Sequence, residues 1–380
     1  MESNLIFMKD TRTLLIRITC LFWIITKLFS YKAWLSDGRL YPVVPPFDFL
    51  DKLPPLAHSI SFFLSLMVLV LLFIFPRKLW LMATLFAVIL FSCLLDVVRW
   101  QPWEYQCLFF LTIFIINRNK PAALFSAIIF VMGCIYIYSG IHKFNGGYLF
   151  VVWEQLILRR IIGLSRADIA HWNLHYIGLI MPVVETLAGV LLLTAKNKKV
   201  PLFLLIVMHV LLLFMLSAAG ISKNRIVLPW NIFMMLILAL YYYRDSHSFS
   251  LRSVLRGPNL AILLFWGILP SLHLAGYWDK KLSASMYSGN MKFMDACIKN
   301  PSAVPQLKKY LTGSNPYKTC TDGQARLPLY AICSDEMHLL PYPEYWYYRR
   351  FKKKWEKLYP QADMEFRVYQ YPYKEVVEIE

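Results

Sequence analysis

A chain of 380 residues with 58% apolar and 17% charged residues is unlike an ordinary soluble domain, where about 45–50% and about 25% are typical. The formal net charge of +17 would suit a nucleic-acid partner, but 24 of the 40 basic residues precede Trp278 against 11 of the 23 acids, mostly between apolar segments. Basic loops beside membrane helices explain this excess, so composition predicts an integral membrane protein in contact with the lipid bilayer and no nucleic-acid partner.

Nine segments are apolar enough to be membrane helices, for which about 20 apolar residues are needed. Six contain no Asp, Glu, Lys or Arg: Leu53–Pro76, Leu79–Leu95, Pro121–His142, Val200–Ser222, Ile226–Tyr243 and Gly257–Trp278. Three are less clean: Leu14–Phe29, Tyr105–Asn117 and Trp172–Ala195. We therefore predict an all-α fold, a polytopic transmembrane bundle of about nine helices at 11–278, with a short basic and aromatic extramembrane tail at 279–380.

Short, densely basic loops alternate along the chain with longer loops of mixed charge. The positive-inside rule then places the N-terminus in the cytoplasm of a multi-pass protein of the bacterial inner membrane. An odd number of helices sends the C-terminal tail to the extracytoplasmic side. One disulfide is expected in that tail, and spacing does not choose the pair among Cys297, Cys320 and Cys333.

Three segments outside these helices have distinctive compositions. Tyr41–Leu56 contains five prolines and several aromatic residues, which predicts a rigid lid. Trp153–Arg166 has apolar residues at helical spacing and two arginines on its polar face, typical of a helix in the interface plane. Tyr345–Leu358 mixes aromatic and basic residues, and is predicted to be either a headgroup-associated surface helix or a protein-docking face.

Polar side chains in apolar helices are functional candidates, because a charge at a helix centre costs about 2.5–3.5 kcal/mol on insertion scales. The first group is Leu95–Gln106, where Asp96, Arg99, Trp103 and Tyr105 gather at the outer mouth of two helices. Asp96 and Arg99 are three residues apart and can pair on one helix face. The group predicts either a ligand site or an aromatic belt with a structural ion pair.

The second group is Tyr136–Asn145, where Tyr138, His142 and Lys143 occur together at the end of an apolar span. A lysine at this depth either extends to the headgroups or lies in a partly desolvated pocket, where its neutral amine can act as a base. Both alternatives fit the spacing.

The third group is spread over three helices. Glu185 lies in the middle of an apolar span, and His209, Trp230 and Asn231 lie in two later ones. A buried carboxylate requires an interior partner or a proton. Each residue alone is typical of a hydrogen bond between packed helices, but together they predict a polar pocket inside the bundle.

Five segments, in this order, resemble the HTTM family (horizontally transferred transmembrane domain), whose best-known members are vitamin K-dependent gamma-carboxylases. They are the acid-Arg-Trp-Gln-Pro-Trp stretch at Asp96–Trp103, the helix end YIYSGIHKFN, the helix with Pro182, Glu185 and Gly189, the Pro-Trp-Asn helix at Pro229–Asn231, and SASMYSGN at Ser283–Asn290. The resemblance covers Thr11 to Asn290 and rests on the ordered set. The helix pattern also resembles small quinone-linked DoxX- and MauE-like membrane proteins.

The resemblance implies that Lys143 is catalytic, because the carboxylases place a catalytic lysine at the end of the matching helix. The implied cofactor is a reduced quinone (menaquinol or vitamin K hydroquinone), which such a lysine deprotonates, and no metal is implied. Two features depart from the carboxylases. Pro102-Trp103 stands where they carry an Asn-His pair, and the residues after Trp278 are fewer than their lumenal domain requires.

We therefore expect an HTTM-type membrane protein that binds a quinone or similar lipid-soluble ligand, either as a gamma-carboxylase-like lyase or as a quinone-linked oxidoreductase. The alternative is a non-enzymatic scaffold whose C-terminal tail recruits a secreted or membrane protein. A transporter relay through Glu185 and His209 is a third hypothesis, and it lacks the paired broken helices typical of that class.

Overall fold

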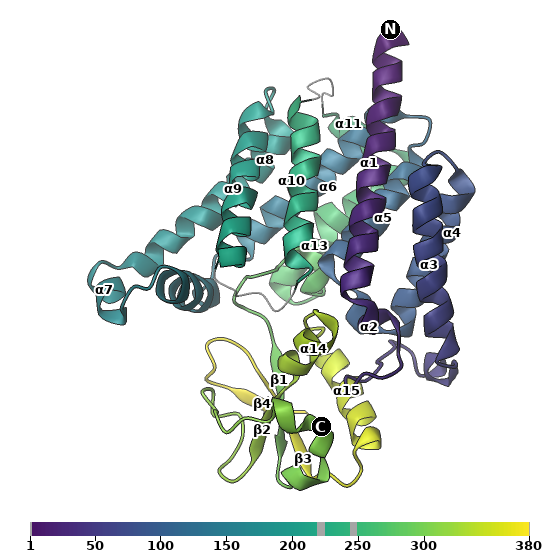
Figure 1. Cartoon of the computed structure of the whole chain (residues 1–380). Coiled ribbons are helices and arrows are strands. Elements are labelled where there is room, and N and C mark those ends of the chain that lie inside the picture. The colour runs from purple at the N-terminus through teal and green to yellow at the C-terminus, as the bar shows by residue number, and fades with distance from the viewer. Residues whose placement is uncertain (1, 219–224, 244–248, 380) are drawn as a thin grey trace.

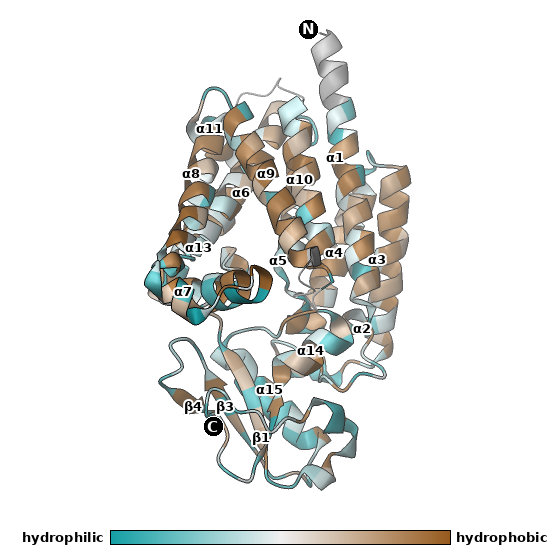
Figure 2. Ribbon diagram, turned by 60° about the vertical axis from the view of Figure 1, so that its left-hand side comes forward, coloured by the Kyte–Doolittle hydropathy of each residue, from teal (hydrophilic) through white to brown (hydrophobic). Residues whose placement is uncertain are grey.

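The computed structural model describes residues 2–218, 225–243 and 249–379. A bundle of helices forms the N-terminal part, and a smaller mixed domain lies at one end of it (Figure 1). Apolar residues dominate the bundle helices, whereas the mixed domain alternates polar and apolar residues (Figure 2). The end of the predicted helix Val200–Ser222 and the chain at 223–224 and 244–248 lie outside the described residues.

All nine segments expected to be membrane helices are helical where the structure describes them. Eight contain one long helix each: α1 (Glu2–Phe29), α3 (Leu56–Ile74), α4 (Leu79–Leu95), α5 (Pro102–Ile116), α6 (Pro121–Ile141), α8 (Ile180–Thr194), α9 (Lys199–Ala218) and α10 (Val227–Tyr243). The ninth combines short 3₁₀, α and π turns: η5 (Gly257–Asn259), α12 (Leu260–Ile262), the π-helix η6 (Leu263–Ile268), α13 (Leu269–Leu272) and η7 (His273–Ala275). Shorter helices lie between them: α2 (Tyr31–Trp34), α7 (Arg166–His171) and α11 (Leu251–Val254).

Five helical segments of the described chain are long and apolar enough to cross a membrane: Leu56–Ile74, Pro121–Ile141, Leu174–Thr194, Lys199–Leu216 and Gly257–Ala275. Helices α4, α5 and α10 are apolar but shorter. These lengths support the predicted membrane protein. The number of crossings and their orientation stay predictions.

Helix α6 is the central helix of the bundle. In its apolar window 78% of the residues are buried inside the protein, against at most 39% in the other four candidate spans. Its closest approach is to α8, where glycines replace side chains: a Cβ on Gly189 would lie 2.9 Å from the carbonyl oxygen of Gly133. A Cβ on Gly140 would lie 2.8 Å from the carbonyl oxygen of Pro182 and would overlap the hydroxyl of Thr186. Small residues therefore set the spacing of these two helices, as is common in membrane bundles.

The segment expected to lie in the interface plane forms a π-helix, η3 (Tyr148–Ile161), which starts before the predicted Trp153. It runs crosswise to the bundle helices beside α7, where Figure 1 shows it almost end-on. Arg159 and Arg160 occupy its last turn, while Ile157 and Leu158 are buried. Its depth in a membrane stays a prediction.

The predicted all-α class is wrong for the C-terminal region, which contains a four-stranded antiparallel sheet in the order β2-β1-β3-β4. The strands are β1 (Phe293–Ile298), β2 (Ala325–Pro328), β3 (Met364–Tyr369) and β4 (Val376–Glu378). The inner strand β1 lacks alternating polarity because both of its faces are buried, and its single charged residue, Asp295, is buried in an ion pair with Arg326 of β2, whose Nε lies 2.5 Å away. A search for alternating polarity in the sequence therefore does not detect the sheet. The predicted tail is a folded domain.

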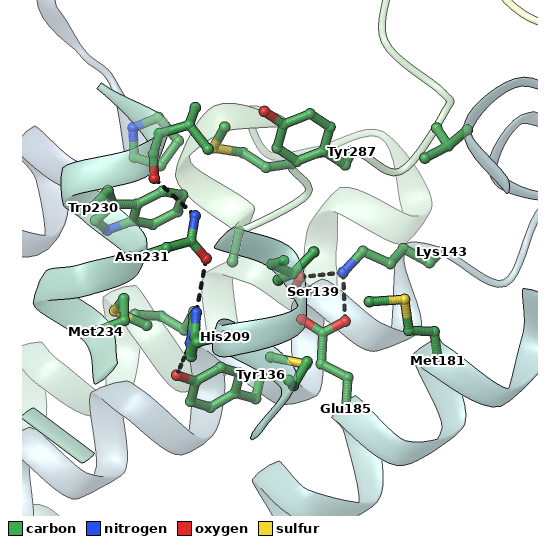
Figure 3. A pocket seen from close by; sticks show the side chains of 18 of the residues that line it. Tyr136, Ser139, Lys143, Met181, Glu185, His209, Trp230, Asn231, Met234 and Tyr287 are labelled. Carbon is green, nitrogen blue, oxygen red and sulfur yellow. Dashed lines mark hydrogen bonds and ion pairs between the residues drawn. The ribbon is translucent and has the colours of Figure 1, made fainter. Parts of the chain in front are cut away.

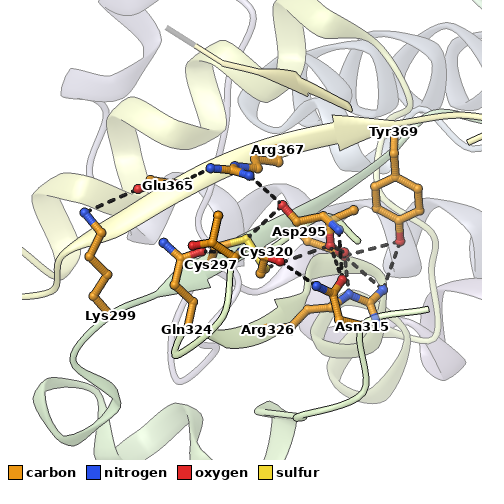
Figure 4. Close-up of a disulfide and its surroundings, with 12 residues drawn as sticks. Asp295, Cys297, Lys299, Asn315, Cys320, Gln324, Arg326, Glu365, Arg367 and Tyr369 are labelled. Atoms are coloured by element: carbon orange, nitrogen blue, oxygen red, sulfur yellow. Dashed lines mark hydrogen bonds and ion pairs between the residues drawn. A yellow bond between two sulfur atoms is a disulfide. The ribbon is translucent and has the colours of Figure 1, made fainter. Parts of the chain in front are cut away.

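A disulfide joins Cys297 of β1 to Cys320 in the loop before β2 (Figure 4). The prediction of one disulfide is confirmed, and the structure supplies the pair that spacing left open. Cys333 is free and buried in α14 (Leu329–Met337).

The predicted helix at Tyr345–Leu358 is α15, with the expected bounds. Its aromatic side chains face the domain interior, where Tyr347, Tyr348, Phe351 and Trp355 are buried. At their spacing these aromatics form the buried side of an amphipathic helix. Only the exposed basic side of α15 is left for either predicted partner, lipid headgroups or a protein, and both alternatives stay predictions.

The proline-rich segment before α3 packs on this domain. The carboxylate of Glu336 in α14 accepts the backbone N–H groups of Leu40 and Tyr41 at 3.0 Å. Arg350 and Lys354 of α15 form ion pairs with Asp48 and Asp51 of the 3₁₀ helix η1 (Asp48–Lys52). The segment is thus ordered by the mixed domain, and its role as a lid stays a prediction.

Replacing Gly140 by alanine tests the close packing of α6 and α8. In an open helix this change stabilises, but here the new methyl group overlaps Thr186, and overpacking costs about 1–3 kcal/mol. We expect a lower midpoint of thermal unfolding in detergent micelles. Gly313→Ala is the matched control because nothing lies within 4 Å of its Cβ position; an equal effect of both variants would contradict the packing argument.

Candidate functional site

Two residues of the first polar group, Asp96 and Arg99, have structural partners other than each other. The predicted pairing of Asp96 with Arg99 is not formed; Asp96 is ion-paired with Arg39. Arg99 donates to the Ser92 carbonyl at 2.7 Å and lies 2.6 Å from Nδ1 of His58. Both side chains are fully buried, so these bonds satisfy charges that would otherwise be costly in an apolar interior.

Three more predicted residues, Trp103, Tyr138 and His142, do not line the cavity inside the bundle. The Trp103 ring centroid is 5.9 Å from that of Trp230, so Trp103 supports a lining residue. Tyr138 donates its hydroxyl to the carbonyl of Gly267. His142 is buried at the C-terminal end of α6. Asp96, Arg99, Trp103, Tyr138 and His142 are therefore outside the lining of the cavity.

A cavity of about 130 Å³ lies inside the bundle. Its lining is largely aliphatic, aromatic and methionine side chains from α5, α6, η3, α8, α9 and α10, with Trp266 of η6. It also contains six residues predicted from the sequence: Tyr105, Lys143, Glu185, His209, Trp230 and Asn231. An apolar cavity with few convergent polar groups is the usual form of a small-molecule site.

Lys143 and Glu185 form an ion pair at one side of the cavity (Figure 3). Lys143 follows the end of α6, and its Nζ also donates to the hydroxyl of Ser139 at 2.9 Å. These two contacts use two of the three N–H donors of the ammonium group. Among the described residues, the third donor is left for an oxygen of a ligand.

A second hydrogen-bonded chain lies across the cavity from this pair (Figure 3). The amide of Asn231 donates to the Val227 carbonyl at 2.8 Å, so its oxygen accepts from Nδ1 of His209, also at 2.8 Å. With a neutral imidazole, Nε2 of His209 then accepts the hydroxyl of Tyr136 at 2.7 Å. These groups satisfy one another, so they shape the cavity wall and need no ligand.

Sequence reasoning missed several lining residues, among them Tyr136, Ser139, Trp266 and Lys281. Lys281 and Tyr287 come from the segment just after the last bundle helix, part of which was noted only as a resemblance motif. The backbones of Gly147 and Gly289 are in direct contact there, and Gly289 has φ +70°. A side chain at either position would separate the segment from the cavity.

A reduced quinone fits the donor set of this cavity. The Nε1–H group of Trp266 is buried without a hydrogen-bond partner among the described residues. A buried unpaired donor costs about 1–3 kcal/mol, so an acceptor oxygen supplied by a ligand would stabilise it. An apolar ring that carries oxygens suits both this donor and the Lys143 ammonium. No group of three or more metal-ligating side chains that could hold a metal ion is found in the described part of the chain.

Comparison with known proteins does not assign this site to a family. No protein-family model, no curated protein and no solved structure matches the chain.

A double-mutant cycle measures the Lys143–Glu185 pair. Glu185→Leu leaves a partly buried ammonium without its partner and is expected to lower the free energy of unfolding by about 3 kcal/mol, the low end of the range for a broken buried pair. The double variant Lys143→Met/Glu185→Leu removes both charges and is expected to be more stable than Glu185→Leu alone. Chemical denaturation in detergent micelles provides both values, and additive effects would show that the two side chains are not coupled.

Proposed function

We propose that this chain is an integral membrane protein that binds a reduced quinone, or a similar apolar ligand bearing oxygens, in the cavity beside Lys143. One observation carries the proposal: polar residues indicated by the sequence on α5, α8, α9 and α10, together with Lys143 just after α6, line a single apolar cavity. If each polar residue only made a hydrogen bond between packed helices, these residues would not need to line the same cavity.

In this proposal each polar group has a defined role. The Lys143 ammonium binds one ligand oxygen, and Glu185 with Ser139 fixes its position. The Trp266 N–H group donates to a second acceptor, while the aromatic ring of Tyr105, 4.9 Å from the ring of Trp266, packs against the ligand. The apolar walls exclude water from these charges, which strengthens each interaction.

The reaction class that we favour is quinone-linked: an oxidoreductase, or a divergent gamma-carboxylase-like enzyme of the HTTM type. A reduced quinone, when bound, supplies the reducing equivalents. The chain supplies binding, orientation and water exclusion.

The same proposal places the mixed domain on the extracytoplasmic side of the inner membrane. The Cys297–Cys320 disulfide supports this side, because disulfides persist in oxidising compartments. The basic loops of the opposite side support a cytoplasmic N-terminus.

Binding of menadione in lipid nanodiscs tests the ligand site, with quenching of tryptophan fluorescence as the measurement. Lys143→Met/Glu185→Leu removes the ammonium without leaving a lone buried charge, and should weaken binding about tenfold or more, as expected for a lost hydrogen bond to a charged group. Lys198→Met is the control, because Lys198 donates to the Leu192 carbonyl at 2.8 Å and does not line the cavity. Unchanged affinity in the double variant would refute the proposal.

The scaffold alternative is favoured by one observation, an exposed stripe on α15. Arg349, Lys353 and Lys357 recur every four residues and point away from the buried aromatics. Such a basic face suits an acidic surface on a secreted or membrane protein.

Charge reversal of this stripe separates the two functions in cells. We expect Arg349→Glu/Lys353→Glu/Lys357→Glu to keep the cellular phenotype of the wild-type gene and Lys143→Met/Glu185→Leu to lose it, with protein levels compared by immunoblotting. Because the substituted residues are exposed, the fold is expected to be retained. The opposite pattern would establish the scaffold.

A further inference from the structure

A second lysine, Lys281, lines the cavity in surroundings unlike those of Lys143. It opens the 3₁₀ helix η8 (Lys281–Ser283), beyond the last candidate membrane span. The residue is 4% exposed, and its Nζ donates to the Leu340 carbonyl at 2.7 Å. Within the described residues no carboxylate forms an ion pair with Lys281, whereas Lys143 is paired with Glu185.

The groups that face Lys281 carry no full negative charge. They are the thiol of Cys333 from α14 and the ring of Tyr342, whose centroid is 5.5 Å from Nζ. Tyr105 of α5 also lines the cavity, and Lys143 and Glu185 lie further along its lining. The neighbouring Lys280 donates instead to the carbonyl of Asn290. Burial lowers the pKa of Lys281 from 10.5 to about 7.

We infer that Lys281 is the proton acceptor for a phenolic or enolic hydroxyl of the ligand. This inference rests on the proposed ligand site and defines its substrate class as an apolar molecule with an acidic hydroxyl. In the step the ligand O–H bond breaks, its electron pair stays on the oxygen, and the proton forms a new N–H bond at Nζ of Lys281. The Leu340 carbonyl and the Tyr342 ring then stabilise the resulting ammonium.

Lys143 and Lys281 have different roles in this inference because their partners differ. A lysine held by a carboxylate is stabilised as the cation and binds the oxyanion that forms. A lysine buried without a counter-ion is stabilised as the free amine, which can accept a proton. With both lysines in one cavity, Lys281 accepts the proton and the Lys143 ammonium binds the oxyanion that forms.

The pH dependence of 1-naphthol binding in nanodiscs tests this assignment. This phenol needs a free amine for proton transfer, so its affinity for the wild type should rise about tenfold from pH 6 to pH 8, as the neutral fraction of an amine with pKa about 7 does. The rise should vanish in Lys281→Met and Lys281→Gln. The rise of affinity with pH should persist in Lys143→Met/Glu185→Leu, although the affinity itself is lower. In Lys280→Met both the rise and the affinity should be unchanged.

Controls separate failure of this inference from failure of the ligand site. Binding of 1-methoxynaphthalene, which lacks the hydroxyl, should not vary with pH. Menadione binding together with a flat 1-naphthol profile, or a rise that survives in Lys281→Met, would overturn the role of Lys281 alone. Failure of the wild type to bind menadione and 1-naphthol would overturn the ligand site and this inference together.

A ligand-free measurement tests the neutral amine itself. Because the folded-state pKa of Lys281 is about 7 and the ordinary lysine pKa is 10.5, the unfolded state binds more protons between these pH values, so stability rises with pH in this window. The folding equilibrium constant of the wild type should increase about 50-fold in total, relative to Lys281→Met, from pH 7 to pH 9. Parallel pH profiles would overturn the assignment.

Discussion

The close contact of α6 with α8 is the constraint on which the candidate site depends. Glycines at the contact bring the two backbones together, and this distance lets the lysine that follows α6 reach the acid in the middle of α8. With larger residues at Gly140 or Gly189, the helices would separate and both charges would lose their partner. One packing choice therefore sets the helix spacing, the ion pair and one side of the cavity.

Other buried charges of the bundle, unlike Lys143 and Glu185, do not line the cavity. Lys27 is buried against Glu104 at 3.3 Å and over the ring of Trp34, and Arg99 is surrounded by backbone carbonyls. Neither Lys27 nor Arg99 lines the cavity. An intramembrane charge is thus a marker of function only where some of its hydrogen-bonding capacity is left free toward open space.

The segment that leads from the bundle to the mixed domain completes the lining of the cavity. The chain between the last bundle helix and β1 crosses the cavity mouth, held by the backbone contact of Gly147 with Gly289 and by Asn145, whose amide donates to the Ser288 carbonyl at 2.9 Å. This segment carries Lys281 and Tyr287 into the lining. The bundle and the segment that leads to the mixed domain therefore share one site.

The sequence by itself determined the apolar helical segments and most of the polar positions in them, because crossing a bilayer imposes a length and a polarity that are local properties. It also indicated Glu185, His209, Trp230 and Asn231 as residues of one polar pocket, and Lys143, in a separate group, as a site residue. It did not reveal the sheet, since the Asp295–Arg326 pair buries charge in the central strand and removes the alternation of a strand pattern. Which polar residues contact one another depends on the tertiary structure. In it Asp96 is paired with Arg39, the aromatic side chains of α15 face the interior of the mixed domain, and Lys281 lines the cavity. Those pairings join residues far apart in the chain, and no local periodicity records them.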